Sequence, residues 1–285
     1  MTMKFANCHF HSTHSDGEYR PRFLARMALG LGYKALALTD HDVLSGNREL
    51  LHEAGKLGLL AMPGVEITCR NAEIGFHLVG LNLDLDNPRL NAFVDQLCEW
   101  RNENTKALFD RGVKLGLLEN ITWDEVEQYN PGCRWFCNEQ VFNAMELKGV
   151  YDPDKRPMQF KEVFASSTSV KLGMRIQEAS VTDAISVIRQ ADGIPVLAHP
   201  YGGRTKYVPE LVEAGLLGIE TCHPSLNEED TRLAEEAAAA YKLYRSGGSD
   251  HNGVMSGCGL PRATPDLGWG ADEEEFMAML ERRRR

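Results

Sequence analysis

The chain has 285 residues, of which 43% are hydrophobic and 25% charged, enough apolar material for a full-sized core and within the range of a single α/β barrel. No apolar run approaches the about 18 residues that a membrane span requires, and the first ten residues lack the pattern of a signal peptide. We therefore expect a cytoplasmic globular protein without membrane contact, and nothing in the sequence indicates an obligate protein partner.

The net charge of −10 bears on the class of ligand. A long polyanionic strand would be repelled except at a local positive site, which bound metal cations could supply. The acidity therefore argues against tight binding of long nucleic acids, but not against a small phosphorylated substrate. The seven cysteines are scattered without a CxxC pair, which fits neither a disulfide framework nor a zinc ribbon.

Short apolar runs alternate along the chain with helical patterns, which is typical of a parallel sheet covered by helices. The predicted strands are Phe5–Cys8, Ala35–Leu38, Leu59–Met62, Phe76–Leu81, Pro195–Ala198, Leu217–Thr221 and Leu243–Ser246. One helix is predicted to begin near Pro21, because proline suits the first turn, and another after Ser180, which starts a capping pattern.

The stretch 88–177 breaks this alternation, because its apolar residues have helical spacing and it contains no strong strand. An irregular loop of that length is uncommon in a compact domain. We therefore predict an inserted helical subdomain at 88–177, carried by a barrel domain formed from 1–87 and 178–285.

Side chains that bind metals occur at or near the ends of all seven predicted strands. They are His9, His11, His41, Glu66, His77, His199, His223, Asp250 and His251. In a parallel barrel the C-terminal ends of the strands meet at one face, where active sites are built. Imidazole and carboxylate groups suit zinc, iron and manganese. A single histidine beside a strand is more often structural, but seven strand ends in succession make coincidence implausible.

Local spacing supports this interpretation. In the segment from His9 to His11, the period-two alternation of a strand points both imidazoles to one side. Asp16 can fold back toward them from the following turn, which Gly17 makes easier. Glu66 has two carboxylate oxygens with which to bridge two metals.

Two further histidines are not counted among the predicted ligands. His52 lies within a helical pattern and not at a strand end, so we expect it on the surface. His14 is near the cluster, and both a spacer role and a contact on the substrate side are open to it.

Five motifs resemble those of the PHP (polymerase and histidinol phosphatase) family. They run from His9 to Gly17, from Thr39 to Asp42, from Pro63 to Glu66, from Leu197 to Pro200 and from Gly248 to Asp250. The match covers the barrel on both sides of the insertion. The segments Phe76–Leu81 and Ile219–Ser225, with the helical insertion, resemble the branch that contains the nucleoside 3′,5′-bisphosphate phosphatases and the 5′-to-3′ exoribonucleases.

This resemblance implies a distorted (β/α)7 TIM-like barrel that carries two or three metal ions, either zinc, iron or manganese. It also implies how the ligands are shared. The first ion would be held by His9, His11, Glu66 and Asp250, the second by Glu66, His77 and His199, and the third by Asp16, His41 and a histidine near Asp250. Glu66 would bridge the first two ions.

The last motif departs from the family pattern. The family has Ser-Asp-x-His, whereas this chain has Ser249, Asp250, His251 and Asn252 in succession, so the histidine stands one residue early. A shift of one residue in a strand turns the side chain to the other face. This segment is a loop at a strand end, so that either His251 or Asn252 is left to complete the third site.

For catalysis, the hypothesis is that two metal ions bridge a water and lower its pKa from about 16 toward about 7, so that hydroxide attacks phosphorus in line. His223 and Asp250 are the candidate catalytic residues, with His223 contacting the phosphate or protonating the leaving oxygen. A structural role for His223 is given equal weight. Arg134, Arg175 and Arg204 are candidates to bind substrate phosphate alongside it, because arginine grips phosphate bidentately.

We therefore predict a phosphoric monoester hydrolase acting on a small phosphorylated substrate, an AMP-like nucleotide or a nucleoside 3′,5′-bisphosphate, with Tyr201 as a candidate to pack on a base. The alternatives are a 5′-3′ exonuclease acting on short RNA or DNA oligonucleotides, a histidinol-phosphate phosphatase, and a non-enzymatic metal-binding accessory module. The large insertion favours the nucleotide branch. The intact ligand set argues against the accessory module.

Overall fold

The computed structural model describes residues 4–165, 177–253 and 268–282. Its centre is a curved sheet with the strand order β1-β2-β3-β4-β6-β7-β8, and β5 pairs with β3. The strands are β1 (Ala6–Asn7), β2 (Ala35–Leu38), β3 (Leu60–Arg70), β4 (Gly75–Leu81), β5 (Ala179–Ser180), β6 (Ile194–Leu197), β7 (Gly218–Cys222) and β8 (Tyr244–Gly247). Just beyond β1, Cys8 N donates to Gly247 O at 3.0 Å, which brings the two edges together and confirms the predicted distorted barrel.

The apolar runs predicted a parallel sheet. The structure differs, because β4 is antiparallel to both β3 and β6. Residues 71–74 join β3 to β4, and a connection this short cannot provide the crossover that a parallel pair needs. Since β4 is reversed, its first residues lie at the face where the parallel strands end, and these include His77. Strand β3 is longer than predicted, so Glu66 lies inside the strand and not after it.

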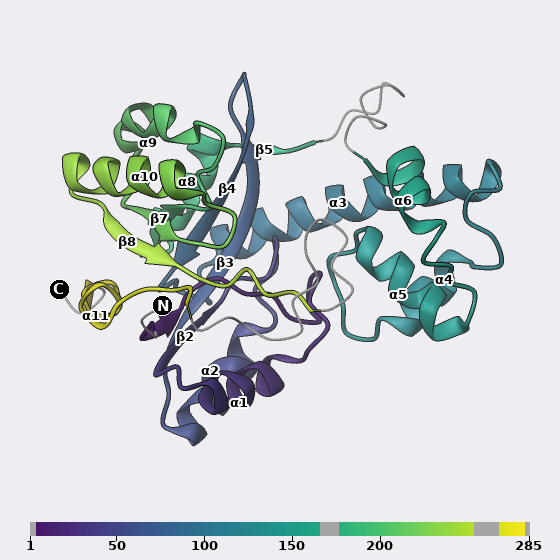
Figure 1. Cartoon of the computed structure of the whole chain (residues 1–285), viewed down its shortest axis with the longest axis horizontal. Helices are drawn as coiled ribbons and strands as arrows, with labels where there is room; N and C mark the ends of the chain where they lie inside the picture. The colour runs from purple at the N-terminus through teal and green to yellow at the C-terminus, as the bar shows by residue number, and fades with distance from the viewer. Residues whose placement is uncertain (1–3, 166–176, 254–267, 283–285) are drawn as a thin grey trace.

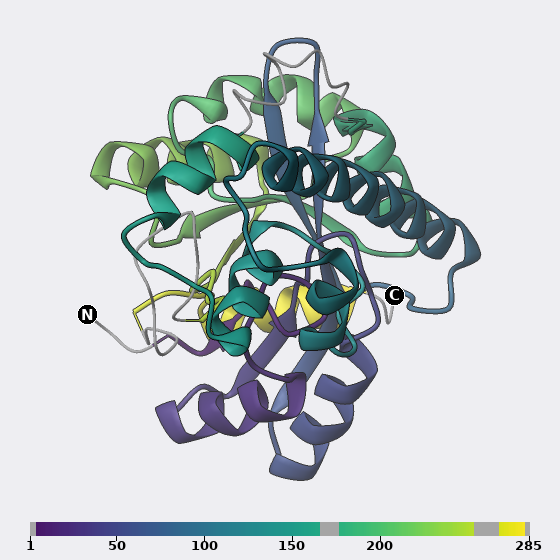
Figure 2. The ribbon, with the colours of Figure 1, turned by 90° about the vertical axis from the view of Figure 1, so that its right-hand side faces the viewer.

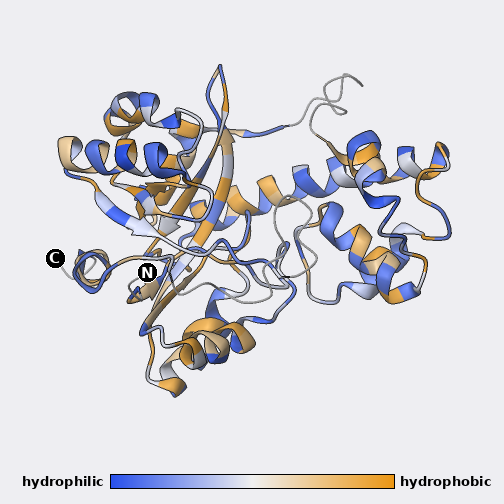
Figure 3. Cartoon of the chain, viewed as in Figure 1, coloured by the Kyte–Doolittle hydropathy of each residue, from blue (hydrophilic) through white to orange (hydrophobic). Residues whose placement is uncertain are grey.

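Alternate residues of the strands pack on opposite sides of the barrel wall. Ala35 and Ala37 of β2 contribute to an interior core with Phe276 of α11, whereas Leu36 and Leu38 pack with α1 and α2 outside. Figure 3 shows the apolar strands enclosed by helices of mixed polarity. The covering helices are α1 (Pro21–Leu31), α2 (Asn47–Leu57), α8 (Val181–Gln190), η2 (Arg204–Tyr207), α9 (Val208–Ala214), α10 (Glu228–Tyr241) and α11 (Glu273–Glu281).

Between β4 and residue 165, the described chain is helical. It forms α3 (Pro88–Lys114), α4 (Trp123–Tyr129), α5 (Asn138–Lys148), α6 (Arg156–Gln159) and η1 (Phe160–Phe164). The first half of α3 packs on the barrel through Leu90 and Val94, and its second half carries Leu108 and Phe109 into a separate core with α4 and α5. Figures 1 and 2 show α3 running from the barrel to this helical cluster. The domain division at 88–177 stays a prediction.

Within the described ranges, no helix combines the length and the apolar character that crossing a bilayer requires.

Candidate metal centre

The predicted ligands come together at the face of the barrel where the parallel strands end. Among the described residues, several sets of three have ligand atoms that all lie within 4.8 Å of one another. These sets include His9–Glu66–His199, His9–His11–Asp250, His11–Asp16–His41 and His41–Glu66–His77. The chain therefore gathers imidazoles and carboxylates from β3, β4 and the loops after β1, β2, β6 and β8 into one cluster of potential metal ligands.

Glu66 lies at the centre of this cluster. Its Oε1 is 2.7 Å from His77 Nδ1 and 3.1 Å from His199 Nε2. Its Oε2 is 3.2 Å from His9 Nε2 and from His41 Nδ1. Burial alone would raise the pKa of this carboxyl, but the surrounding histidines, His9 first, hold it well below its usual range. An ionised carboxylate with both oxygens engaged is suited to bridge two ions.

The unpaired atoms of the cluster fit metal ions. Among the described side chains, His9 Nε2, His41 Nδ1 and Glu66 Oε2 are buried without a hydrogen-bond partner, although each has another ligand atom within 3.2 Å. Two ligand atoms that each lie about 2.1 Å from one ion are separated by about 3.0–3.4 Å. The donor set of imidazole and carboxylate is therefore spaced for shared ions, and it suits zinc, iron or manganese.

His9 and His199 are oriented by Glu220, a residue that the sequence reasoning did not single out. His9 Nδ1 donates to Glu220 Oε1 at 2.8 Å, which leaves Nε2 with a lone pair for a metal. Glu220 Oε2 accepts a hydrogen bond from His199 N at 2.6 Å, where the backbone of His199 has a φ of 27°. Burial raises the pKa of Glu220, but His9 and His223 outweigh this and keep the pKa below its usual value. The sequence signal that could have identified Glu220 is a carboxylate inside the buried strand β7.

Asp40 builds the turn that carries Asp16. Its Oδ1 accepts hydrogen bonds from Ser12 N and from Ser15 Oγ, both at 2.7 Å. Gly17 N donates to Ser12 O at 2.9 Å, and a Cβ at Gly17 would lie 2.4 Å from the nearest backbone oxygen. Only glycine fits this close approach, as its position beside Asp16 predicted.

The turn brings Asp16 to two histidines. Asp16 Oδ1 lies 3.5 Å from His11 Nδ1, and its Oδ2 lies 3.9 Å from His41 Nε2. Burial lowers the pKa of His41 to about 4, so its imidazole stays neutral and offers a lone pair. Asn252 Nδ2 donates to Asp16 Oδ2 at 3.2 Å.

His251 does not join this set of ligand atoms. Its ring stacks on Tyr19, with the ring centroids 5.9 Å apart and the planes 7° from parallel. Within the part of the chain that the structure describes, His251 belongs to none of the sets of potential ligands. The structure therefore brings Asn252, and not His251, to Asp16.

His223 lies beside Asp250 at the edge of the cluster. Ser225 N donates to His223 Nδ1 at 3.1 Å, so a neutral His223 carries its proton on Nε2. That Nε2 lies 3.5 Å from Asp250 Oδ2, and Asp250 Oδ1 lies 3.0 Å from His11 Nε2. A protonated nitrogen does not ligate a metal, so this geometry suits proton donation or a phosphate contact.

The three candidate arginines lie in different surroundings. Arg134 is exposed, pairs with Asp95 at 3.1 Å, and lines a cavity that contains none of the predicted ligands. Arg175 lies outside the described residues. Arg204 lines a cavity of about 150 Å³ together with His77 and His199. Of the two candidate arginines that the structure describes, only Arg204 lies beside the cluster.

Tyr201 packs beside Arg204 and His199 and is 40% exposed. The guanidinium of Arg204 lies 4.3 Å from the ring centroid, and the His199 ring stacks at 5.7 Å. Arg204 Nη1 also donates to Tyr201 O at 3.0 Å. That a base packs on Tyr201 stays a prediction, and the contacts with Tyr201 hold Arg204 in place.

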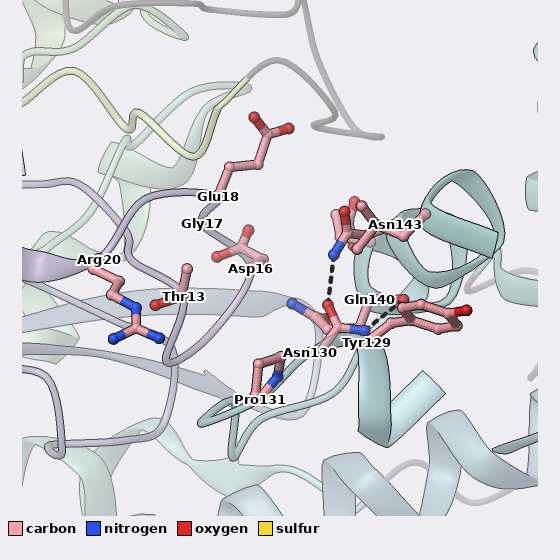
Figure 4. A pocket seen from close by; sticks show the side chains of 12 residues that line it. Thr13, Asp16, Gly17, Glu18, Arg20, Tyr129, Asn130, Pro131, Gln140 and Asn143 are labelled. Atoms are coloured by element: carbon pink, nitrogen blue, oxygen red, sulfur yellow. Dashed lines mark hydrogen bonds between the residues drawn. The ribbon is translucent and has the colours of Figure 1, made fainter. Parts of the chain in front are cut away.

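A second cavity, of about 280 Å³, opens beside Asp16. One wall is the turn from Thr13 to Arg20, and the other is formed by α4 and α5 with Tyr129, Gln140 and Asn143 (Figure 4). The helical insertion therefore forms part of the surroundings of the metal centre.

The two histidines that were not counted among the predicted ligands, His14 and His52, lie apart from the ligand sets of the described chain. His52 is exposed on α2, which confirms its predicted place on the surface. His14 Nδ1 lies 2.8 Å from Ser45 Oγ, and His14 is in none of the ligand sets of the described chain.

The fold and the ligand cluster can now be compared with those of known proteins. Residues 7–132 match the model of the PHP domain. The 5′-3′ exoribonuclease Rnm of Escherichia coli is 31% identical, over 85% of this chain and 83% of its own length. The phosphoribosyl 1,2-cyclic phosphate 1,2-diphosphodiesterase of Eggerthella lenta is 28% identical, over 86% and 93%. The 3′,5′-nucleoside bisphosphate phosphatase of Chromobacterium violaceum is 29% identical, over 87% of each chain.

A solved structure from Bifidobacterium adolescentis, described as a metal-dependent phosphoesterase, has the same fold, with a TM-score of 0.82 and 24% identity over 98% of this chain and 96% of that one. The chain belongs to the PHP family. It is a metal-dependent phosphoesterase, a hydrolase that acts on phosphoester bonds.

Proposed function

We propose that this chain hydrolyses a phosphomonoester of a small nucleotide, AMP-like or a nucleoside 3′,5′-bisphosphate. The observation that carries the proposal is the pair of small cavities on the metal cluster, about 150 Å³ beside His77 and His199 and about 280 Å³ beside Asp16. Both cavities lie below the range of about 300–1,000 Å³ that is typical of small-molecule sites, so they suit a small phosphorylated ligand better than a polymer strand. Each has a single arginine in its lining, Arg204 or Arg20, which is too little positive charge for a strand of nucleic acid.

The ligand assignment is part of this proposal. His9, His11, Glu66 and Asp250 would hold one ion. Glu66, His77 and His199 would hold a second, and His11, Asp16 and His41 would surround a third. When bound, the ions lower the pKa of water toward about 7 and neutralise charge on the phosphoryl oxygens.

The remaining residues act on the substrate or on the ligands. His223 faces Asp250 with its Nε2 proton and would donate that proton to the leaving oxygen. Arg204 is fixed by the carbonyl of Tyr201 and would grip a second phosphate at the mouth of the cluster. Glu220 keeps His9 and His199 oriented.

The relatives support nucleotide chemistry, and they also suggest a second candidate. The Chromobacterium violaceum relative is named for nucleoside bisphosphates, and the Escherichia coli relative for RNA. The 31% identity to the exoribonuclease favours 5′-3′ cleavage of short oligonucleotides as the second candidate function.

A substrate panel tests the proposal. Phosphate release would be measured with adenosine 3′,5′-bisphosphate, AMP and histidinol phosphate, and mononucleotide release with a short 5′-phosphorylated oligonucleotide, with the bound metals quantified in parallel. Phosphoribosyl 1,2-cyclic phosphate belongs in the panel because the Eggerthella lenta relative is named for it. We expect the highest kcat/KM with the bisphosphate or AMP. A higher value with the oligonucleotide or the cyclic phosphate would contradict the proposal.

A further inference from the structure

Trp135, between α4 and α5, is stacked on a predicted metal ligand. Its ring centroid lies 4.8 Å from that of His41, with the planes 19° apart, and the side chain is 5% exposed. The other stacking neighbour of His41 is His11, at 4.5 Å and 17°. The imidazole is therefore held between two flat rings, which restricts the rotation that would turn its nitrogens away from Asp16 and Glu66.

A hydrogen bond adds a second constraint next to His41. Trp135 Nε1 donates to Asp42 Oδ2 at 3.1 Å, while Asp42 Oδ1 accepts from Thr68 N at 3.1 Å. Asp42 has a φ of 47°, in the left-handed region that non-glycine residues adopt at a cost. The Trp135 N–H thus helps to hold the strained residue that follows His41. From the outer side, the Arg101 guanidinium lies 4.9 Å from the Trp135 ring.

The same segment of the insertion also contacts the turn that carries Asp16. Arg134 N donates to His14 O at 3.3 Å, and Gln140 Nε2 donates to Ser15 O. Figure 4 shows Gln140 and Asp16 on opposite walls of the cavity between the insertion and the barrel. The segment 133–140 therefore touches both stretches of chain that deliver ligands to the set His11, Asp16 and His41.

We propose that Trp135 is a positioning residue for the ion held by His11, Asp16 and His41, and that it couples docking of the helical insertion to occupancy of that site. The inference rests on the proposed third set of ligands. Residues that orient metal ligands typically change metal affinity by about 10–100-fold when they are replaced. Docking of segment 133–140 would thus complete the metal centre as well as one wall of the cavity.

The test compares metal binding by the full chain and its variants. The apo-proteins would be titrated with Mn²⁺ in a metal-buffered solution, with bound metal measured by elemental analysis and folding checked by circular dichroism. We expect Trp135→Leu to weaken one class of site by about 10–100-fold and to change the other sites less, because His41 Nδ1 also lies 3.2 Å from Glu66 Oε2. Trp135→Phe keeps a ring over His41 but loses the N–H, so an intermediate affinity is expected. Trp123→Leu is the matched control, because Trp123 packs on Phe109 and Phe136 inside the insertion.

The outcomes separate this inference from the proposed function. A wild-type isotherm without a third class of site overturns both the third ligand set and the role of Trp135. A third class of site that binds Mn²⁺ equally well in wild type and Trp135→Leu overturns the role of Trp135 alone. The role of Trp135 is also overturned if Trp123→Leu weakens that site as much as Trp135→Leu does, because the effect is then a general loss of stability. If Trp135→Leu does not fold, an isotherm of Trp135→Phe that superimposes on wild type overturns the inference.

Discussion

The two halves of the proposed metal centre are held in different ways. The barrel-held set, His9, Glu66, His77 and His199, comes from strands or strand ends, and Glu220 of β7 orients two of its members. The insertion-braced set, His11, Asp16 and His41, includes ligands on loops that segment 133–140 contacts. Sites on strands are positioned by the sheet itself, whereas loop ligands need additional support. The difference teaches that an insertion far along the sequence can become part of a metal centre.

The largest effect is expected from His9→Ala, which breaks the barrel-held set. His9 Nε2 is 3.2 Å from Glu66 Oε2 and 3.7 Å from Asp250 Oδ1, so its loss affects the centre of the cluster. Metal ions supply several kcal/mol of transition-state stabilisation, and we expect kcat/KM for the preferred phosphoester to fall by about 10³-fold or more. Steady-state kinetics and metal analysis measure this. His52→Ala, at an exposed residue, is the control, and its kcat/KM should equal that of wild type. Full activity of metal-loaded His9→Ala would refute the assignment of His9 as a ligand.

A smaller and more selective effect is expected from Glu220→Gln. The amide can still contact His9 but removes the buried charge, so affinity for metal at the barrel-held set should fall by about 10–100-fold. The insertion-braced site should keep its affinity, which is the reverse of the pattern expected for Trp135→Leu. Mn²⁺ isotherms of the two variants, with exposed Glu210→Gln as control, provide the comparison. Equal losses at both sets would show that the two halves do not behave separately.

The smallest effect is expected from Arg204→Ala, which leaves both sets of ligands intact. Arg204 lines the cavity beside His77 and His199, so it should act on the substrate and not on the metals. A hydrogen bond to a charged group contributes about 1.5–3 kcal/mol, and we expect KM for adenosine 3′,5′-bisphosphate to rise about tenfold or more, with less change for AMP. Arg48→Ala, at an exposed ion pair with Asp86, is the control. An unchanged KM would remove Arg204 from the substrate site.

Sequence reasoning found the barrel and the ligand types because both depend on local pattern. A short apolar run predicted Ala35–Leu38 with its observed bounds, and the proline rule predicted the helix start at Pro21. The reversal of β4 was missed, because an apolar run carries no information on strand direction. The short connection 71–74 that forces the reversal became visible only with the full length of β3, which was predicted to end at Met62.

The missed residues at the site act through contacts between distant segments. Trp135 is 94 residues from His41 along the chain, and no spacing rule connects an aromatic residue in an insertion with a histidine after β2. Glu220 lies within a segment that was noted for its resemblance, yet its two hydrogen bonds depend on how β7 lies beside β6. The displaced His251 could be recognised from the motif, but its stacking on Tyr19 required the folded loop.

The reversed strand β4 has a consequence for the evolution of chain length. Because β4 runs the other way, Leu81 ends at the face opposite the metal cluster. The 27 residues of α3, about 40 Å long, run from there to the core of the insertion, to which their second half contributes. Each residue of a helix adds about 1.5 Å and about 100° of rotation. A deletion of one residue between Arg101 and Leu108 would thus turn the whole insertion out of phase with the barrel. The length of α3 therefore sets which face the insertion presents to the barrel.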